Sequence, residues 1–170
     1  MLIRPSKISD AHSMSCIYVQ TWQDTYLGVV PYGYLSEMTV SLHEKAFLRE
    51  LRGRHIVSYV AETNHRVVGF ITGGYERNGD QIYTGEIYTL YVMKKHQRRG
   101  IGAKLVSALA KQFNHLGIYS MLVQVLKQNP YRHFYIKING LHLQTQPISF
   151  AGEILEAETY GWIDSTLVHR

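Results

Sequence analysis

The stretch HQRRGIGAKLVSAL, residues 96–109, joins two features that rarely occur together. Its second half has the apolar spacing of a helix, yet Gly100 and Gly102 come directly before it, and glycine weakens helices. Arg98 and Arg99 add positive charge at a helix end that is already positive. A bound anion would explain both features, because glycine leaves the first N–H groups of a helix accessible and arginine adds charge-assisted hydrogen bonds. The stretch therefore predicts a loop that binds a pyrophosphate.

Two common phosphate-binding loops are excluded by the residues that follow the glycines. A P-loop needs Lys followed by Ser or Thr, and here Lys104 is followed by Leu105. A Rossmann fingerprint needs a third glycine at the position of Leu105. From these few residues alone, an ordinary glycine-containing turn before a helix remains an equal alternative.

The elements on either side of the loop predict a parallel pair of strands. Residues 82–93 and 119–126 have strand-like composition, and residues 100–116 form the helix between them. A β-α-β unit of this kind places its strands side by side with a right-handed crossover. The helix is expected to bury its apolar stripe, which consists of Leu105, Leu109, Phe113 and Leu116.

The rest of the chain predicts a mixed, largely antiparallel sheet of about seven strands with flanking helices, in the α/β (α+β) class. The other expected strands are residues 2–4, 56–62, 66–76, 141–150 and 154–160, the last two as a closing hairpin. Helices are expected from Ser9-Asp10 to Gly28, over residues 31–53 and from Asn129-Pro130. The stripe expected to be buried in the second helix is Leu35, Leu42, Ala46, Phe47 and Leu51. Because no repeat or linker interrupts the pattern, we expect one domain over residues 1–170.

Composition narrows the class of protein further. The net charge of +5 favours anionic partners, and no apolar run approaches the length of a membrane span. The single cysteine, Cys16, excludes an intrachain disulfide and fits a reducing cytoplasm, and its apolar surroundings predict a buried thiol. None of the nine histidines forms an H-x-x-x-H or H-E-x-x-H pair, so we expect no metal.

The loop and its neighbours resemble the GNAT superfamily of acetyl-CoA-dependent N-acetyltransferases. Gln97 to Gly102 match the family motif Q/R-x-x-G-x-G/A, and residues 86–92 resemble the strand that precedes it. Asn129 and residues 134–140 are similar to a later segment, N…F-Y-E-K-x-G-F, from which Ile136 and the run 139–141 depart. The resemblance implies the GNAT fold and acetyl-CoA as the acetyl donor.

The resemblance assigns cofactor-binding roles to three groups of residues. Main-chain amides of the loop would hold the pyrophosphate, with Gln97 part of the motif, and the strand before it would bond the pantetheine arm. These residues are Gln97, Arg98, Arg99, Gly100, Ile101, Gly102 and Ala103 in the loop, and Leu90, Tyr91 and Val92 in the strand. An N–H at Leu90 would polarise the thioester carbonyl. Asn129 would bond the pantetheine, cap the following helix, or do both.

Glu86 and Tyr135 are the candidate catalytic residues. Glu86 would accept the amine proton, through water because a free glutamate has a pKa of about 4.3. It lies on a strand whose even positions, including Leu90, are expected to share one face. A solvated or ion-paired carboxylate is the alternative. Tyr135, protonated at neutral pH because its reference pKa is about 10, would donate to the departing thiolate. A core aromatic role, or Tyr131 as the donor, is the alternative there.

Residues 21–31 are expected to line the acceptor site, because they resemble a W-x-x-x-Y-x-G-x-x-P version of the family. Trp22 and Tyr26, at i and i+4, would form an apolar or cation-binding wall, or would anchor the helix in the core. Asp24 would attract a cationic amine or remain solvated.

We therefore expect an N-acetyltransferase that acetylates a primary amine of a small molecule or protein by direct attack in a ternary complex. A non-catalytic acyl-CoA sensor is the alternative, since it would need the loop but neither Glu86 nor Tyr135. Nucleic-acid binding, suggested by the basic run 94–99, is not expected because no nucleic-acid motif accompanies it. A homodimer through the C-terminal hairpin remains open.

Overall fold

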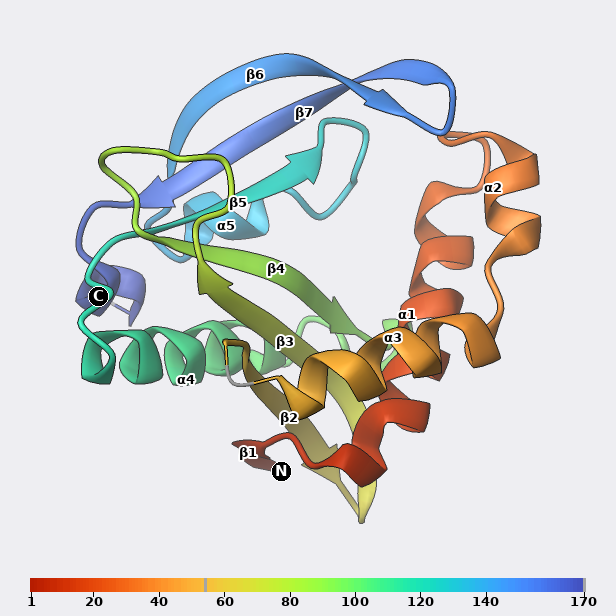
Figure 1. Ribbon diagram of the computed structural model, residues 1–170, viewed down its shortest axis with the longest axis horizontal. Coiled ribbons are helices and arrows are strands. Elements are labelled where there is room, and N and C mark those ends of the chain that lie inside the picture. The colour runs from red at the N-terminus through yellow and green to blue at the C-terminus, as the bar shows by residue number, and fades with distance from the viewer. Residues whose placement is uncertain (54, 170) are drawn as a thin grey trace.

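The computed structural model describes residues 1–53 and 55–169, which build one twisted sheet with helices on both faces (Figure 1). The strands are β1 Leu2–Pro5, β2 Val57–Thr63, β3 Arg66–Tyr75, β4 Gly85–Val92, β5 Met121–Leu126, β6 Leu141–Phe150 and β7 Glu153–Trp162. The α-helices are α1 Ala11–Tyr26, α2 Tyr32–Glu37, α3 Val40–Arg52, α4 Ile101–His115 and α5 Phe134–Lys137, and short 3-10 helices cover Ile8–Asp10, Lys94–His96 and Ser165–His169.

The seven strands lie in the order β1-β2-β3-β4-β5-β7-β6. All neighbours are antiparallel except β4 and β5, which are parallel and joined through α4. The predicted fold class, the mixed seven-stranded sheet and the β-α-β unit around the glycine loop are therefore confirmed.

Successive side chains of β3 point to opposite faces of the sheet and pack into different parts of the core. Ile71 packs in the cluster that contains the buried face of α4, whereas its neighbour Phe70 packs with residues of α1 and α3 on the opposite face of the sheet. Leu105, Leu109 and Phe113 are fully buried, as their spacing predicts. Leu116 was expected to join them, but it is 50% exposed because α4 ends at His115 and the residue lies past the last helical turn.

An extra residue in β4 changes which side chains share a face. Thr72 of β3 pairs with Thr89 and Gly73 pairs with Ile87, so Tyr88 has no partner of its own and forms a β-bulge. Leu90 consequently packs in the α4 cluster with Ile87. The expectation that Glu86 and Leu90 share a face is wrong, because a bulge reverses the alternation of the side chains that follow it.

The beginning of β4 is also displaced from its predicted position. The strand begins at Gly85, because residues 76–84 form a connection organised by Asp80, whose carboxylate accepts from the N–H groups of Ile82 and Tyr83 at 2.8 Å each. Tyr119, which was expected in the next strand, lies before β5 and is 63% exposed.

The helix predicted over residues 31–53 is two helices. The chain leaves the helical conformation at Met38 and Thr39, and Thr39 caps the second helix by accepting from the Leu42 N–H at 3.2 Å. That turn places Leu42 on the surface, so the predicted buried stripe is wrong at this position. Cys16 is exposed on α1 rather than buried, with its sulfur 3.6 Å from His12 Nε2.

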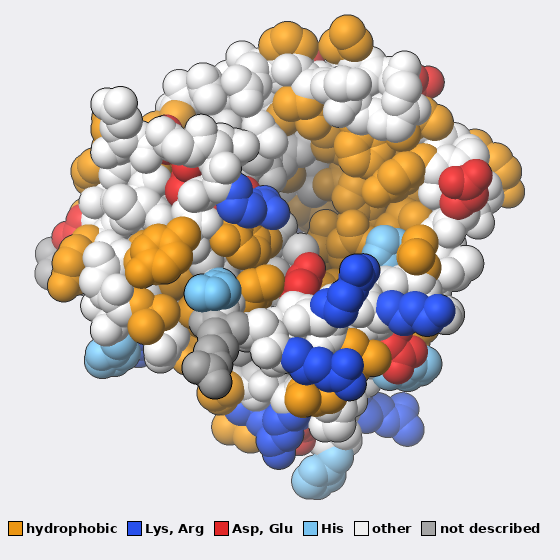
Figure 2. Space-filling view, viewed as in Figure 1, with side chains coloured by type: hydrophobic (Ala, Val, Ile, Leu, Met, Phe, Trp, Pro, Cys, Tyr) orange, Lys and Arg blue, Asp and Glu red, His pale blue; other side chains and the backbone are white. Residues whose placement is uncertain are grey.

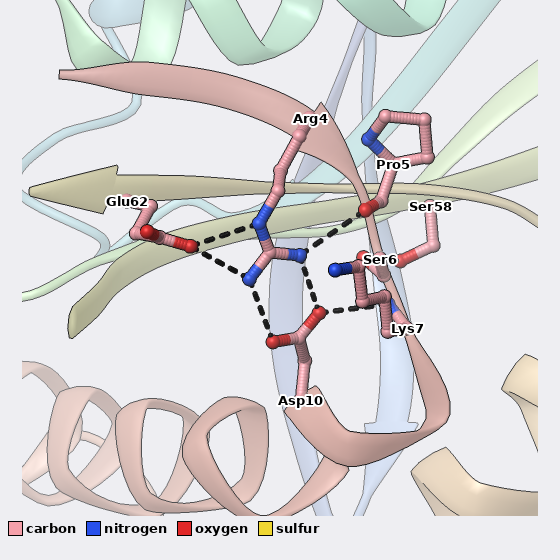
Figure 3. Close-up of polar contacts among 7 residues, drawn as sticks. All are labelled: Arg4, Pro5, Ser6, Lys7, Asp10, Ser58 and Glu62. Atoms are coloured by element: carbon pink, nitrogen blue, oxygen red, sulfur yellow. Dashed lines mark hydrogen bonds and ion pairs between the residues drawn. The ribbon is translucent and has the colours of Figure 1, made fainter. Parts of the chain in front are cut away.

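An ion-pair network fastens the N-terminal strand to the sheet (Figure 3). Arg4 donates to Glu62 at 2.8 Å and to both carboxylate oxygens of Asp10 at 2.7 and 2.9 Å. The Lys7 N–H donates to the same Asp10 carboxylate at 2.7 Å. Burial by itself would raise the pKa of Asp10, but these bonds hold it below its usual value. The network joins β1, β2 and the turn that begins α1.

Candidate active site

The N-terminus of α4 has a full set of unpaired main-chain donors. Gly100 precedes the helix with a φ of 75°, a left-handed conformation that side chains rarely adopt, and no side chain caps the helix. The Lys104 N–H is bonded to the Gly100 carbonyl at 3.1 Å. Within the described part of the chain, the N–H groups of residues 98–103 have no hydrogen-bond partner. They form a site to which an anion can bind.

The loop before α4 is held in place by two contacts. The Gln97 side-chain amide donates to the Val92 carbonyl at 2.9 Å, which ties the loop to the end of β4. Gly102 faces the ring of Phe134, and a Cβ at this position would come within 3.1 Å of that ring. The second glycine therefore permits close packing of α5 against α4, in addition to any approach by a ligand.

Beside this loop, β4 and β5 diverge. Their parallel pairing covers Gly85↔Met121 to Ile87↔Val123, whereas β4 pairs with β3 as far as Val92. The β5-facing edge of residues 88–92 is therefore open among the described residues. An extended ligand can hydrogen-bond along such an edge as an added strand would.

A cavity of about 500 Å³ lies between the loop, the end of β4, α1 and the segment 129–137 that contains α5. Most of the residues predicted to bind the cofactor line it, namely Leu90, Tyr91, Val92, Gln97, Arg98, Gly100, Ile101, Gly102, Ala103, Asn129 and Tyr135. Tyr26 from the predicted acceptor segment lines it as well. Arg99, Trp22 and Glu86 are not among its lining residues.

The Tyr135 ring closes one wall of the cavity. It is 9% exposed and packs against Phe134, Tyr160 and Trp162 at centroid distances of 5.3, 5.6 and 6.3 Å. Burial raises the pKa of Tyr135, so the phenol stays protonated. Its hydroxyl has no hydrogen-bond partner among the described residues. The hydroxyl oxygen is nevertheless not completely buried. The hydroxyl can therefore donate to a ligand in the cavity.

Asn129 joins the cavity to α1. Its side-chain NH₂ donates to the Tyr26 hydroxyl at 2.7 Å, and its carbonyl oxygen accepts from the Tyr131 N–H at 2.8 Å. Burial raises the pKa of Tyr26 to about 12, partly opposed by this bond. The prediction that Asn129 caps a helix is wrong, because residues 129–133 form turns and α5 begins at Phe134 behind His133.

Glu86 is buried and ion-paired. It is 5% exposed, and Arg77 donates to both of its oxygens, from Nε at 2.9 Å and from a terminal nitrogen at 2.6 Å. The carboxylate in turn raises the pKa of Arg77. The Arg77 guanidinium also lies 4.0 Å from the centroid of the Tyr88 ring. Glu86 is therefore an ion-paired carboxylate, which the sequence analysis gave as the alternative to a role in accepting the amine proton.

Comparison with known proteins agrees with this architecture. The sequence model described as "Acetyltransferase (GNAT) family" matches residues 16–141. The chain belongs to the GNAT family. It is 29% identical to the uncharacterized N-acetyltransferase YuaI of Bacillus subtilis (strain 168), over 99% of this chain and 98% of that protein.

Solved GNAT-fold structures superpose over most of the chain. An N-acetyltransferase from Staphylococcus aureus Mu50 aligns with a TM-score of 0.77 and 23% identity, covering 96% of this chain and 98% of its own. The PaiA N-acetyltransferase from Thermoplasma acidophilum, in complex with coenzyme A, aligns with a TM-score of 0.70 and 21% identity, covering 93% and 98%. These similarities show that the folds are alike.

Several residues of the GNAT-family cavity were not identified from the sequence. Those not assigned to the site are Pro130, His133, Phe134 and Lys137. Thr21 and Thr25, which also line the cavity, lie in the segment 21–31 that was expected to line the acceptor site. They are four residues apart and so share a face of α1. Tyr131, weighed as an alternative to Tyr135, lines the cavity too.

Within residues 1–53 and 55–169, no three His, Cys, Asp or Glu side chains gather as a metal-binding group would require. No helix in the described part of the chain combines the length and the apolar character needed to cross a membrane.

Proposed function

We propose that this chain, as one GNAT domain over residues 1–170, transfers the acetyl group of acetyl-CoA to a primary amine by direct attack in a ternary complex. The observation that carries the proposal is the row of unpaired N–H groups at residues 98–103, because all of these residues except Arg99 line the cavity beside the end of β4. Such a row suits a pyrophosphate, and the coenzyme A bound by PaiA contains one.

The residues present fit each part of the donor. The loop amides and Arg98 face the diphosphate end of the cavity. The open edge of β4 offers the main-chain N–H groups of Leu90 and Val92 to the pantetheine arm, with Tyr91 between them. Tyr135 lies at the cavity wall with a free hydroxyl, where the sulfur of the donor would be placed.

In the proposed reaction the amine nitrogen forms a bond to the thioester carbon, the carbon–sulfur bond breaks, and the amine loses a proton. The Leu90 N–H would stabilise the negative charge that develops on the carbonyl oxygen. Tyr135 would donate to the departing thiolate. Because burial raises the pKa of Tyr135, it is a weak acid, and hydrogen-bond donation is its main contribution. Glu86 would receive the amine proton through water, since Arg77 occupies both of its oxygens.

Binding of the donor tests the proposal directly. We expect saturating acetyl-CoA to raise the melting temperature, and ATP and NAD to leave it unchanged. Amine-dependent release of free thiol from acetyl-CoA then tests turnover. Acetyl-CoA that neither binds nor releases thiol in the presence of any amine would refute the proposed function.

Replacing Tyr135 tests its role. Tyr135→Phe removes the hydroxyl but keeps the ring contacts with Phe134, Tyr160 and Trp162. We expect kcat to fall at least ~10-fold with little change in acetyl-CoA affinity, because the lost interaction forms mainly in the transition state. Unchanged turnover would reject Tyr135 as the donor and leave Tyr131 to be tested in the same way.

The ion pair of Glu86 favours one second candidate, a sensor that binds acyl-CoA without turnover. Its carboxylate is held by Arg77, so the chain has no unpaired base at this position. A sensor would show the acetyl-CoA melting shift and release no thiol with a broad panel of amines. Thiol release in that panel would exclude it.

A further inference from the structure

Several aromatic side chains gather beside α1, on the face of the sheet opposite α4. Trp22 packs against Phe150 with nearly parallel rings at 5.7 Å, and Tyr34 contacts both of them at 5.7 and 4.7 Å. Tyr18 lies 5.8 Å from Trp22 and 5.1 Å from Tyr91. We call these five residues, Tyr18, Trp22, Tyr34, Tyr91 and Phe150, the aromatic wall.

A hollow in the surface lies over the elements that carry the aromatic wall. Figure 2 shows this hollow lined mostly by hydrophobic side chains, on the side where Figure 1 places α1, α2 and the tip of the β6–β7 hairpin. Tyr18, Tyr34, Tyr91 and Phe150 are each only partly buried. Tyr91 also lines the donor cavity, so the aromatic wall and the cavity share this residue of β4.

Glu50 faces the aromatic wall from α3. His43, Phe47 and Glu50 are spaced i, i+4 and i+7, which places them on one face of the helix. The first two contact Tyr18, at centroid distances of 4.6 and 5.9 Å. Tyr18 also experiences the charge of Glu50, in addition to the burial that raises its pKa. Glu50 therefore lies one turn beyond Phe47 on the face of α3 that packs against Tyr18.

The Glu50 carboxylate is half-buried without a partner. Neither a hydrogen bond nor an ion pair joins it to any described residue, whereas Glu86 is fully bonded to Arg77. Burial raises the pKa of Glu50, and the charges of Arg77 and Arg49 oppose that rise. A half-buried carboxylate without a bonded cation is stabilised when a cation binds to it.

Arg77 does not form an ion pair with Glu50. Both of its bonds go to the Glu86 carboxylate, so Arg77 and Arg49 act on Glu50 only through space. Aromatic faces attract cations as well, which adds to the preference of the half-buried carboxylate for a bound cation. A carboxylate on the acceptor would be brought close to Glu50 and would be unfavourable there.

We infer that the acceptor is a primary amine carried on a flat, apolar skeleton, an arylalkylamine, whose skeleton packs on the aromatic wall and whose ammonium group is bound by Glu50. This inference rests on the proposed function, and it adds the substrate class and a specificity-determining residue. It adds no covalent step, because the bound ammonium loses its proton before the attack described above.

Two matched acceptors test the substrate class. Phenethylamine and phenylalanine share the same ring and amine, and phenylalanine adds a carboxylate. With acetyl-CoA saturating, we expect thiol release with a kcat/KM at least ~10-fold higher for phenethylamine, which is the effect of one charged hydrogen bond. Spermidine and a peptide with a free N-terminal alanine complete the panel. A higher kcat/KM for phenylalanine, spermidine or the peptide would overturn the inference.

Glu50→Gln tests the residue. We expect the KM for phenethylamine to rise about 10-fold, with kcat and the acetyl-CoA melting shift unchanged, because the lost contact holds the acceptor alone. Glu44→Gln is the matched control on α3, where the carboxylate bonds His12 at 2.9 Å. A KM for phenethylamine that Glu50→Gln leaves unchanged, or that Glu44→Gln raises equally, would overturn the assignment.

A direct binding measurement separates the two proposals. In the presence of coenzyme A, phenethylamine is expected to quench the fluorescence of Trp22, and Trp22→Phe to lose that signal. Quenching without thiol release would support the arylalkylamine site while rejecting the transferase. Thiol release from other amines, without quenching by phenethylamine, would support the transferase while rejecting the site.

Discussion

The first turns of α3 and α4 both present main-chain N–H groups that have no partner within the helix, but the two helices differ in how these groups are bound. At α3, Thr39 adopts an extended conformation and its hydroxyl accepts from the Leu42 N–H at 3.2 Å. At α4, Gly100 has a φ of 75°, no side chain caps the helix, and arginines stand where an acidic residue would be favourable. A helix cap stabilises by about 1 kcal/mol, so α4 forgoes a contribution that α3 takes. The difference supports the proposal that the start of α4 binds an anion from outside the chain.

Packing explains why α4 is stable without a cap. Its buried residues Leu105, Val106, Leu109 and Phe113 are completely inaccessible and fill the space against the sheet. Most helical stability in proteins comes from such packing rather than from the helix ends. The helix therefore does not need a side-chain cap, and the loop amides stay available for a ligand.

The largest expected effect comes from the turn in front of α1, where an ion pair holds the residue that precedes the helix. Asp10, in front of α1, bonds Arg4 and the Lys7 N–H (Figure 3). We expect Asp10→Ala to lower the free energy of unfolding by about 3 kcal/mol, because it leaves the Arg4 charge partly buried without this partner. Acetyl-CoA affinity of the folded variant should be unchanged. Chemical denaturation and calorimetric titration measure the two quantities.

The same carboxylate has a defined pH dependence. Its pKa is lower in the folded than in the unfolded protein, so its stabilisation is present above the unfolded value of about 4. It is lost as the pH falls through the folded-state pKa. A wild type and an Asp10→Ala variant whose unfolding free energies change identically with pH in the acid range would contradict this.

Gly100→Val is expected to weaken acetyl-CoA binding about 100-fold. No atom lies within 4 Å of the added Cβ, but a β-branched residue is strained at this φ and its branches project into open space beside the unpaired amides. Calorimetric titration with acetyl-CoA measures the loss. Affinity equal to that of the wild type would show that the loop does not need its left-handed residue to hold the diphosphate.

The two arginines should differ, because Arg98 lines the cavity and Arg99 does not. We expect Arg98→Ala to reduce acetyl-CoA affinity about 10-fold, and Arg99→Ala less than about 3-fold, since a screened surface charge contributes little. Raising the salt concentration should weaken the wild type more than Arg98→Ala. Equal losses for the two variants would mean that only net charge matters here.

Thr39→Val gives the smallest effect and is the control for Gly100→Val. Removing the cap should lower the free energy of unfolding by about 1 kcal/mol, measured by denaturant titration, and leave acetyl-CoA affinity intact. If Thr39→Val weakened acetyl-CoA binding as Gly100→Val does, the contrast between the two helix starts would not concern the ligand.

Sequence reasoning was accurate where a feature depends on neighbouring residues. The glycine loop, the buried stripe of α4 through Phe113 and the parallel unit around them follow from local spacing, and the structure has them. It failed where distant contacts decide. The bulge at Tyr88 is a matter of pairing with β3, and it separates Glu86 from the face of Leu90. The break at Thr39 is different, because its signal is local: the Thr39 hydroxyl accepts from the Leu42 N–H and caps α3.

By itself, the sequence determined the family, the strand order around the loop and the residues that offer main-chain nitrogen atoms, because periodicity and glycine placement are local properties of the chain. Only the tertiary structure decided which side chains share a space. It paired Glu86 with Arg77 and left Glu50 unpaired beside Tyr18, although both carboxylates look alike in the sequence. The physical reason is that burial and ion pairing depend on segments far apart along the chain, which meet only when the sheet and its helices pack.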